Sequence, residues 1–215
     1  MPFSEKSKNR LLKMNIAIEN IFLIGNPGLE GLKNYEPNIN KEELFQKYNL
    51  SNKYIFSVFH PETKRKDNYI EKFFKNLQKI SKKYNLDVVI IKPNCDPNYN
   101  KILENISSNN FFIIDNLKRD DYLSIAYYSE FYLGNSSSGI YELPYLKIPI
   151  INVGDRQDGR ELATNIVSCN YDNLLECMTN TIDNRCVKNI EYSYKIYDSI
   201  HKFNESLEKI FLKNI

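Results

Sequence analysis

The sequence predicts an α/β fold built on a parallel, doubly wound sheet. Short, mostly apolar segments alternate with segments of helical periodicity from one end of the chain to the other. Strands without polar positions are typical of parallel sheets that helices cover on both faces. The composition agrees, because 42% hydrophobic and 26% charged residues in a chain of 215 are ordinary for a globular protein and exclude wholesale disorder.

Several segments are predicted to be strands, because each is short, apolar and bounded by turn-forming residues. In chain order they are residues 21–25, 54–59, 87–91, 111–114, 131–133, 148–153 and 165–168. The clearest is YIFSVF at 54–59, which ends at His60-Pro61. The run DVVII at 87–91 is typical of a strand that is buried on both faces.

Helices are predicted where apolar residues recur three and four positions apart. They are residues 4–14, 41–48, 67–84, 120–128, a segment after Ser136, and about 188–212. The helix at 67–84 is the best defined, because an apolar stripe runs from Ile70 to Ile80. Ser4 is expected to cap the first helix, and Pro144 is expected to kink or shorten the one after Ser136.

Charge and cysteine usage narrow the range of functions. Lys and Arg number 29 and Asp and Glu 27, so the net charge of +2 calls for neither a nucleic-acid nor a membrane partner. No stretch approaches the roughly 20 apolar residues that span a bilayer, and the N-terminus lacks the apolar region of a signal peptide. The cysteines, Cys95, Cys169, Cys177 and Cys186, have no CxxC or CxxH spacing. They are expected to be reduced thiols of a cytoplasmic protein that binds no zinc.

Both ends of the chain depart from a self-contained domain of this class. The chain opens on a helix instead of a strand with a glycine-rich turn, and a long helix follows the last strand–helix pair. One interpretation is that the closing helix simply covers the sheet. The other is that both ends lie beside a second domain that this chain lacks, and length alone does not decide between the two.

Three polar loops follow predicted strands. In open parallel sheets, ligands bind at the carboxyl ends of the strands, so these loops form the candidate site. They are residues 60–63 (HPET), 134–139 (GNSSSG) and 154–160 (GDRQDGR). Together they indicate a site for a nucleoside diphosphate with a pair of sugar hydroxyls.

The serine loop, residues 134–139, is suited to binding phosphate. Its small residues let the backbone approach an anion, the following helix presents unpaired N–H groups, and Ser136, Ser137 and Ser138 add hydroxyl donors. The alternative is a plain N-cap, since serine and asparagine are preferred capping residues. Glu142 would repel a phosphate, and it is better suited to accepting hydrogen bonds from two ribose hydroxyls. The alternative there is a solvated helix glutamate.

His60 and two arginines complete the candidate set. A histidine at the end of a strand can donate to a phosphate or move a proton near neutral pH, and it is equally compatible with a turn residue. Arg156 and Arg160 can each clamp a diphosphate through bidentate contacts, or can serve only solubility. His201, in the closing helix, is expected to be incidental.

Two runs of sequence resemble the signature of the hydrolysing UDP-N-acetylglucosamine 2-epimerases: LGNSSSGIYELP at 133–144 and KIPIINVGDRQDGR at 147–160. The triple serine and the Gly-Asp-Arg-Gln segment look most like the branch that serves sialic acid and related nonulosonate synthesis. The HPET loop at 60–63 is similar to the histidine loop of that branch, and IGNPGLE at 24–30 resembles its Gly-Ser-Pro-Gly-Leu-Asp segment. The resemblance extends over essentially the whole chain.

The resemblance implies one half of a GT-B-type fold, in which two Rossmann-like domains face each other across a cleft. This chain looks like the carboxyl-terminal half, with a UDP-binding domain at 1–187 and a closing helix at 188–215 that packs on a missing amino-terminal domain. The implied site residues are His60 at the diphosphate, Ser136, Ser137, Ser138 and Gly139 at the phosphates, Glu142 at the ribose, Arg160 as the arginine after the last strand, and Leu117 and Arg119 at the uracil.

The implied reaction is elimination of UDP across C1–C2 of the sugar, followed by addition of water to give N-acetylmannosamine or a diacetamido relative. No metal or other cofactor is implied, and the family's acid/base carboxylates have no counterpart in this chain. Two alternatives stay open: a GT-B glycosyltransferase domain, and a binding-only module without turnover. The expected partners are a UDP-sugar substrate and the amino-terminal domain, and whether the chain forms a homodimer stays open.

Overall fold

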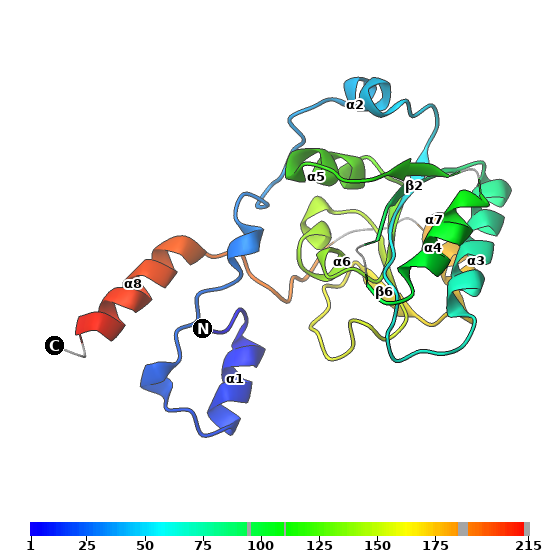
Figure 1. Ribbon diagram of the computed structural model, residues 1–215. Helices are drawn as coiled ribbons and strands as arrows, with labels where there is room; N and C mark the ends of the chain where they lie inside the picture. Colours follow the sequence, from blue (N-terminus) through cyan, green and yellow to red (C-terminus); the bar gives the residue numbers. More distant parts are fainter. Residues whose placement is uncertain (94–95, 110, 185–188, 213–215) are drawn as a thin grey trace. The chain divides into compact units, whose positions relative to one another are not determined.

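A computed structural model describes residues 1–93, 96–109, 111–184 and 189–212. The chain divides into two compact units, one at 36–191 and one that joins 1–35 to 192–215 (Figure 1). The unit at 36–191 contains the sheet, and the other unit contains the first and last helices of the chain.

The sheet is parallel throughout, as the sequence predicts. Its strands are β1 (Tyr54–Val58), β2 (Asp87–Ile91), β3 (Phe112–Ile114), β4 (Phe131–Gly134), β5 (Ile150–Val153) and β6 (Ile166–Cys169). They lie in the order β3-β2-β1-β4-β5-β6, and every adjacent pair runs parallel. Strand, helix and parallel neighbour recur along the chain, so the α/β, Rossmann-like fold class is confirmed.

Helices cover both faces of this sheet (Figure 1). On one side lie α3 (Tyr69–Tyr84), α4 (Tyr99–Ser107) and α7 (Leu174–Asp183). On the other lie α5 (Arg119–Tyr127) and α6 (Ser138–Tyr141), followed by a 3-10 turn at Leu143–Leu146, while α2 (Lys41–Tyr48) precedes β1. The core beneath α3 is aromatic: the ring of Phe59 stacks on that of Phe73 with centroids 3.9 Å apart. Burial of rings of this size supplies much of the stability of a domain.

Two local predictions need correction, and one helix was not predicted. Residues 21–25 are not a strand, because among the described residues their unit offers no strand to pair with. Helix α4 was not predicted, because only Ile102 and Ile106 of its side chains are buried and two apolar positions make a weak periodic signal. The last helix, α8 (Ser199–Leu212), begins later than predicted. The backbone of Glu191 is instead bonded to Thr164, donating to Oγ1 at 3.0 Å and accepting from the amide at 3.2 Å.

The unit that joins the two ends of the chain contains α1 (Glu5–Lys13) and α8. Ser4 caps α1 as predicted, since its Oγ accepts a hydrogen bond from the Ser7 amide at 3.1 Å. No residue of α1 is buried, and α8 leaves Phe203, Phe211 and Leu212 exposed. The predicted boundary between residues 187 and 188 lies outside the described residues.

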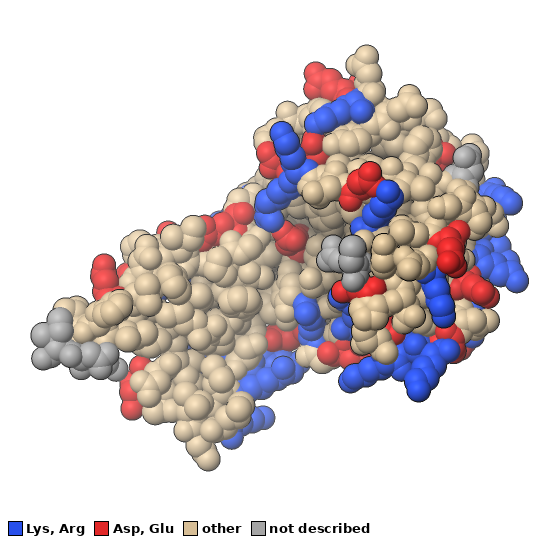
Figure 2. All heavy atoms as spheres, in the orientation of Figure 1, with Lys and Arg blue, Asp and Glu red and all other residues tan. Residues whose placement is uncertain are grey.

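The surface carries charges of both signs. Lys and Arg side chains are interspersed with Asp and Glu over the face shown in Figure 2, as the small net charge leads us to expect. Within the described part of the chain, none of the helices combines the length and the apolar character needed to cross a bilayer.

Candidate functional site

The strand order reverses between β1 and β4. From β1 the chain builds outward to β2 and β3, and from β4 it builds the opposite way to β5 and β6. The loops after β1 and β4 therefore leave the sheet edge in opposite directions and open a crevice between them. Two of the three predicted loops begin at this switch point, and the third follows β5 beside it.

A pocket of about 350 Å³ lies at the switch point. It is lined by the ends of β1 and β2, by the segment that leads into α5 and by the serine loop. The lining residues are Val58, Ile91, Asn116, Leu117, Arg119, Tyr122, Ser136, Ser138 and Glu142. Thus Leu117, Arg119, Ser136, Ser138 and Glu142, which come from separate parts of the sequence, meet in one pocket.

The serine loop passes very close to β1. A Cβ atom on Gly134 would lie 2.1 Å from the Val58 carbonyl oxygen, so only glycine allows this approach. The Ser138 hydroxyl donates to Ser136 Oγ at 3.2 Å and is 2.5 Å from the hydroxyl of Tyr122. The loop therefore presents a connected set of hydroxyl groups at the pocket.

The serine hydroxyls are not used to cap α6. Ser137 occupies the N-cap position, and its side chain makes no capping hydrogen bond. The helix is a single turn with Glu142 at its C-cap, and Pro144 lies in the 3-10 turn that follows. The helix is thus short, as Pro144 predicts. Gly139, in this turn, packs against Tyr132, whose Cε1 would be 2.6 Å from an added Cβ.

Glu142 and Arg119 form an ion pair across the mouth of the pocket. The Glu142 side chain is 23% exposed and that of Arg119 is 50% exposed, so a ligand can reach both. A half-exposed pair of this kind contributes little to stability. Glu142 is thus an accessible carboxylate whose orientation Arg119 fixes, not a solvated helix glutamate.

His60 is buried beside the serine loop. Its backbone is bonded to the Asn135 side chain, while its own Nδ1 has no hydrogen-bond partner among the described residues and lies 3.8 Å from Asp96 Oδ2. Burial and the nearby Arg156 guanidinium lower the pKa of His60, and Asp96 partly offsets them. The imidazole is therefore neutral near pH 7 and can either donate or accept one hydrogen bond.

The two candidate arginines occupy different surroundings. Arg156 Nη1 donates to the Asn135 carbonyl oxygen at 3.2 Å, next to the serine loop. The Arg160 guanidinium lies over the ring of Tyr141, 4.9 Å from its centroid. A second pocket, of about 440 Å³, lies between the histidine loop and the Gly154 loop (residues 154–160), and Arg156 lines it while Arg160 does not.

Sequence reasoning did not single out Asn135, which organises these loops. Its side chain is fully buried, and its carbonyl oxygen also accepts a hydrogen bond from Gln157 Nε2 at 2.6 Å. A lone asparagine between a strand and a serine run is read most simply as a turn residue. Its position could have identified it from the sequence, since Asn135 is the first residue after β4, at the switch point.

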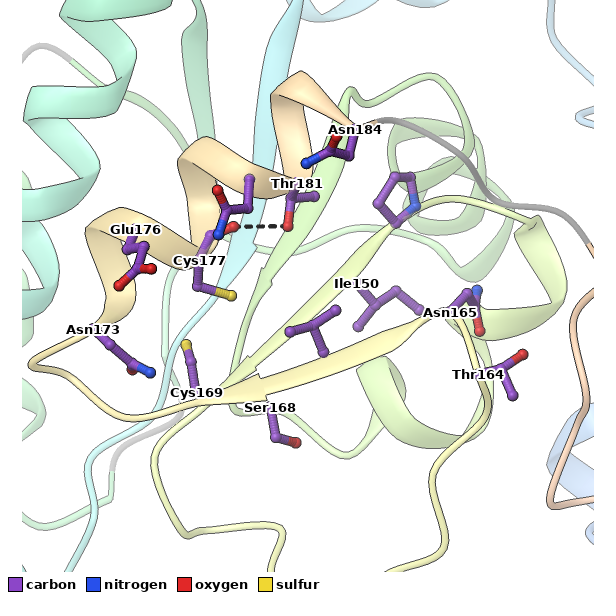
Figure 3. Close-up of a pocket in the computed structure, with 13 residues that line it drawn as sticks. Ile150, Thr164, Asn165, Ser168, Cys169, Asn173, Glu176, Cys177, Thr181 and Asn184 are labelled. Carbon is purple, nitrogen blue, oxygen red and sulfur yellow. Dashed lines mark hydrogen bonds between the residues drawn. The ribbon is translucent and has the colours of Figure 1, made fainter.

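A third pocket, of about 470 Å³, lies between β6 and α7 and contains none of the predicted site residues (Figure 3). Cys169 and Cys177 point toward each other there as free thiols. Their hydrogen bond raises the pKa of Cys169 and lowers that of Cys177. Cys95 and Cys186 lie outside the described residues. In the part of the chain that is described, no three His, Cys, Asp or Glu side chains are grouped so as to hold a metal ion.

The chain matches one protein family over nearly its whole length. The family described as UDP-N-acetylglucosamine 2-epimerase matches residues 1–208. A hydrolysing GDP/UDP-N,N'-diacetylbacillosamine 2-epimerase of Campylobacter jejuni is 33% identical over 175 residues, which are 78% of this chain and 45% of that protein. A hydrolysing UDP-N,N'-diacetylbacillosamine 2-epimerase of Legionella pneumophila is 29% identical over 193 residues, 86% of this chain and 51% of that protein. The chain thus spans about half the length of these relatives.

Solved structures share the fold. A structure of S. aureus MnaA with UDP superposes with a TM-score of 0.73 at 18% identity, covering 100% of this chain and 60% of that one. A UDP-GlcNAc 2-epimerase of Neisseria meningitidis, bound to UDP-GlcNAc, gives a TM-score of 0.66 at 22% identity, covering 96% of this chain and 59% of that one.

Proposed function

The chain belongs to the UDP-N-acetylglucosamine 2-epimerase family, and from this premise we propose that it is the UDP-binding portion of a hydrolysing epimerase. One observation carries the proposal. Leu117, Arg119, Ser136, Ser138 and Glu142, all expected to bind the nucleotide, line a single pocket at the switch point of the sheet. This is where open α/β sheets bind nucleotides.

In this proposal the serine loop holds the phosphates. Ser136, Ser137 and Ser138 donate hydroxyl hydrogen bonds to the phosphate oxygens, and Gly134 lets the loop that carries them lie close against β1. Neutral His60 adds one donor at the diphosphate. Arg160 is assigned as the clamp of the diphosphate, which requires its guanidinium to leave the ring of Tyr141.

Glu142 then binds the ribose. Its carboxylate accepts hydrogen bonds from both hydroxyls, and Arg119 holds that carboxylate in place. Leu117 and Arg119 border the part of the pocket that the uracil occupies.

The proposed reaction begins with loss of UDP from a UDP-N-acetylhexosamine or a diacetamido analogue. This chain stabilises the leaving diphosphate through the serine hydroxyls and His60. Removal of the carbon-bound C2 proton needs a positioned base, which we assign to a segment outside residues 1–215. Residues 1–187 would then bind UDP, and the closing segment at 188–215, which contains α8 (Ser199–Leu212), would pack on an amino-terminal domain, in the cytoplasm. No metal or redox cofactor takes part in this scheme.

Calorimetric titration with UDP tests the proposal. We expect binding by the 215-residue chain, and binding about tenfold weaker for Glu142→Ala and for Ser136→Ala, because each loses hydrogen bonds to a charged or desolvated partner. Glu43→Ala, at an exposed position of α2, is the control and should bind as the unaltered chain does. Absence of heat and of any thermal shift at millimolar UDP would overturn the assignment of the site.

A second experiment tests whether the base that removes the C2 proton lies outside these 215 residues. When the chain is incubated with UDP-N-acetylglucosamine in D₂O, we expect neither release of UDP nor deuterium at C2, because the base is absent. Rapid exchange would mean that the base lies within these residues. With the complete protein, a requirement for a sugar acceptor would favour glycosyl transfer over hydrolysis.

A further inference from the structure

Two loops beside the candidate site are joined by one buried carboxyl group. Glu62, in the histidine loop after β1, is only 5% exposed. Its Oε1 accepts a hydrogen bond from the Tyr171 hydroxyl at 2.6 Å, and its Oε2 accepts one from Arg65 Nε at 3.1 Å. Tyr171 follows β6, so this contact ties the loop after β1 to a distant part of the chain.

The Gly154 loop packs directly on the same carboxyl group. Gly154 has φ +77°, and a Cβ there would lie 2.1 Å from Glu62 Oε1 and 2.7 Å from the Tyr171 hydroxyl oxygen. The next residue, Asp155, is a hydrogen-bond partner of Glu62 and also pairs with Arg65, whose Nη2 is 3.4 Å from Asp155 Oδ2. Both loops are therefore held by the same group of atoms.

The pKa values of Glu62 and Asp155 shift in opposite directions. Burial and the hydrogen bond with Asp155 raise the pKa of Glu62, with Tyr171 and Arg65 opposing them. The same hydrogen bond is the main cause that lowers the pKa of Asp155. Glu62 is therefore the member of this pair that keeps its proton to the higher pH. The other charged or titratable groups that face this pair are Asp67 and Tyr69, beside Arg65, and Lys64, Asp96, Arg156 and Asp158 around the adjoining pocket.

These loops also carry His60, which the proposed function assigns to the diphosphate, and the residues that connect it to the Gly154 loop. His60 lies two positions before Glu62, and Arg156 and Gln157 follow Asp155 directly. Arg156 and Gln157 both donate to the Asn135 carbonyl oxygen, and the Asn135 side chain is bonded to the backbone of His60. The contacts close into a ring, so a shift of Glu62 relative to Asp155 moves His60 relative to Arg156.

We propose that Glu62 is a positioning residue: its carboxyl group, held by Tyr171 and Arg65, keeps the histidine loop and the Gly154 loop in the arrangement that holds His60 at the diphosphate, beside Arg156. The inference rests on the proposed function, because it concerns the same nucleotide site. If Glu62 has this role, UDP affinity should fall as the pH rises and Glu62 loses its proton. Two facing carboxylates then repel each other and the loops separate.

The test compares UDP affinity across the pH range for three variants. Glu62→Gln cannot titrate. It keeps an oxygen for Tyr171 and offers an N–H to Asp155, but it loses the hydrogen bond that Oε2 accepts from Arg65. We expect it to lose the pH dependence that the unaltered chain shows, while titration of UDP itself affects both proteins equally. Glu62→Leu should weaken binding about tenfold at every pH, and Tyr171→Phe by a smaller factor. Glu43→Gln and Tyr84→Phe, at sites away from this cluster, are matched controls and should behave as the unaltered chain.

The inference is overturned if folded Glu62→Leu binds UDP normally. Should that variant fail to fold, the Gln variant decides, and an affinity-against-pH curve parallel to that of the unaltered chain overturns the inference. NMR of the ligand-free chain separates failure of the positioning role from failure of the proposed function. The carboxyl ¹³C signal of Glu62 follows its titration, and the amide signals of the two loops show whether they respond to it. If UDP does not bind at all but the amides of His60 and Arg156 shift with the Glu62 titration, the positioning role stands and the nucleotide assignment falls. If the amide signals of His60 and Arg156 do not change while Glu62 titrates, the positioning role itself is overturned.

Discussion

The side chain of Asn135 pairs with the backbone of His60 in both directions. Its Oδ1 accepts from the His60 amide at 2.8 Å, and its Nδ2 donates to the His60 carbonyl oxygen at 2.8 Å. The backbone amide of Asn135 also donates to Val58 at the end of β1. An asparagine side chain thus continues the pairing of β1 and β4 beyond the last strand residues and holds the two loops at the switch point together.

Replacing Asn135 with alanine should therefore destabilise the fold. Both polar groups of the His60 backbone would be left buried without this partner, which costs about 2–4 kcal/mol in the free energy of unfolding. Urea denaturation measures this cost. Asn180→Ala, at an exposed position of α7, is the control and should change stability by less than about 0.5 kcal/mol. Equal effects of the two substitutions would contradict the bridging role.

Glu142→Gln should separate binding from stability. The ion pair with Arg119 is partly exposed, so its loss should change the free energy of unfolding by no more than about 1 kcal/mol. UDP affinity should fall about tenfold, because a neutral amide is a weaker acceptor for the ribose hydroxyls than a carboxylate. Denaturation and calorimetry on the same preparation provide both values. A large loss of stability with unchanged affinity would assign Glu142 a purely structural role.

The lowered pKa of His60 predicts how stability depends on pH. The folded state binds the proton more weakly than the unfolded state, whose histidine pKa is about 6.5. The stabilisation is thus complete above the unfolded pKa and is lost as the pH falls below it. The free energy of unfolding, measured from about pH 8 to about pH 5.5, should fall less steeply for His60→Asn. Asn180→Ala, at an exposed position of α7, is the control and should keep the slope of the unaltered chain.

Two glycines of one loop allow a clean comparison. Gly154 and Gly159 have φ of +77° and +79°, but an added Cβ meets Glu62 only at Gly154 and meets nothing within 4 Å at Gly159. Gly159→Ala should cost about 1 kcal/mol for the left-handed backbone alone. Gly154→Ala should cost about 1–3 kcal/mol more, because the carboxyl group must move. Equal losses of stability in thermal or urea unfolding would show that the loop does not pack on Glu62.

Much of the fold could be predicted because the relevant signals are local. A strand such as 54–58 is buried at each position and apolar at all but Ser57, and a helix such as 69–84 repeats its apolar residues once per turn. Where the local signal was thin, as in α4, the prediction missed the element. Where an apolar run had no partner strand, as at 21–25, a strand was predicted that does not form.

The sequence by itself determined the parallel α/β class, the loops that follow the strands and the family to which the chain belongs, since each of these is written in short runs of residues. Only the tertiary structure decided that β1 lies beside β4, that Arg119 pairs with Glu142, and that Glu62 meets Tyr171 from 109 residues away. Periodicity encodes which face of an element is buried. It does not encode which element covers that face, because partner choice depends on the packing of the whole sheet.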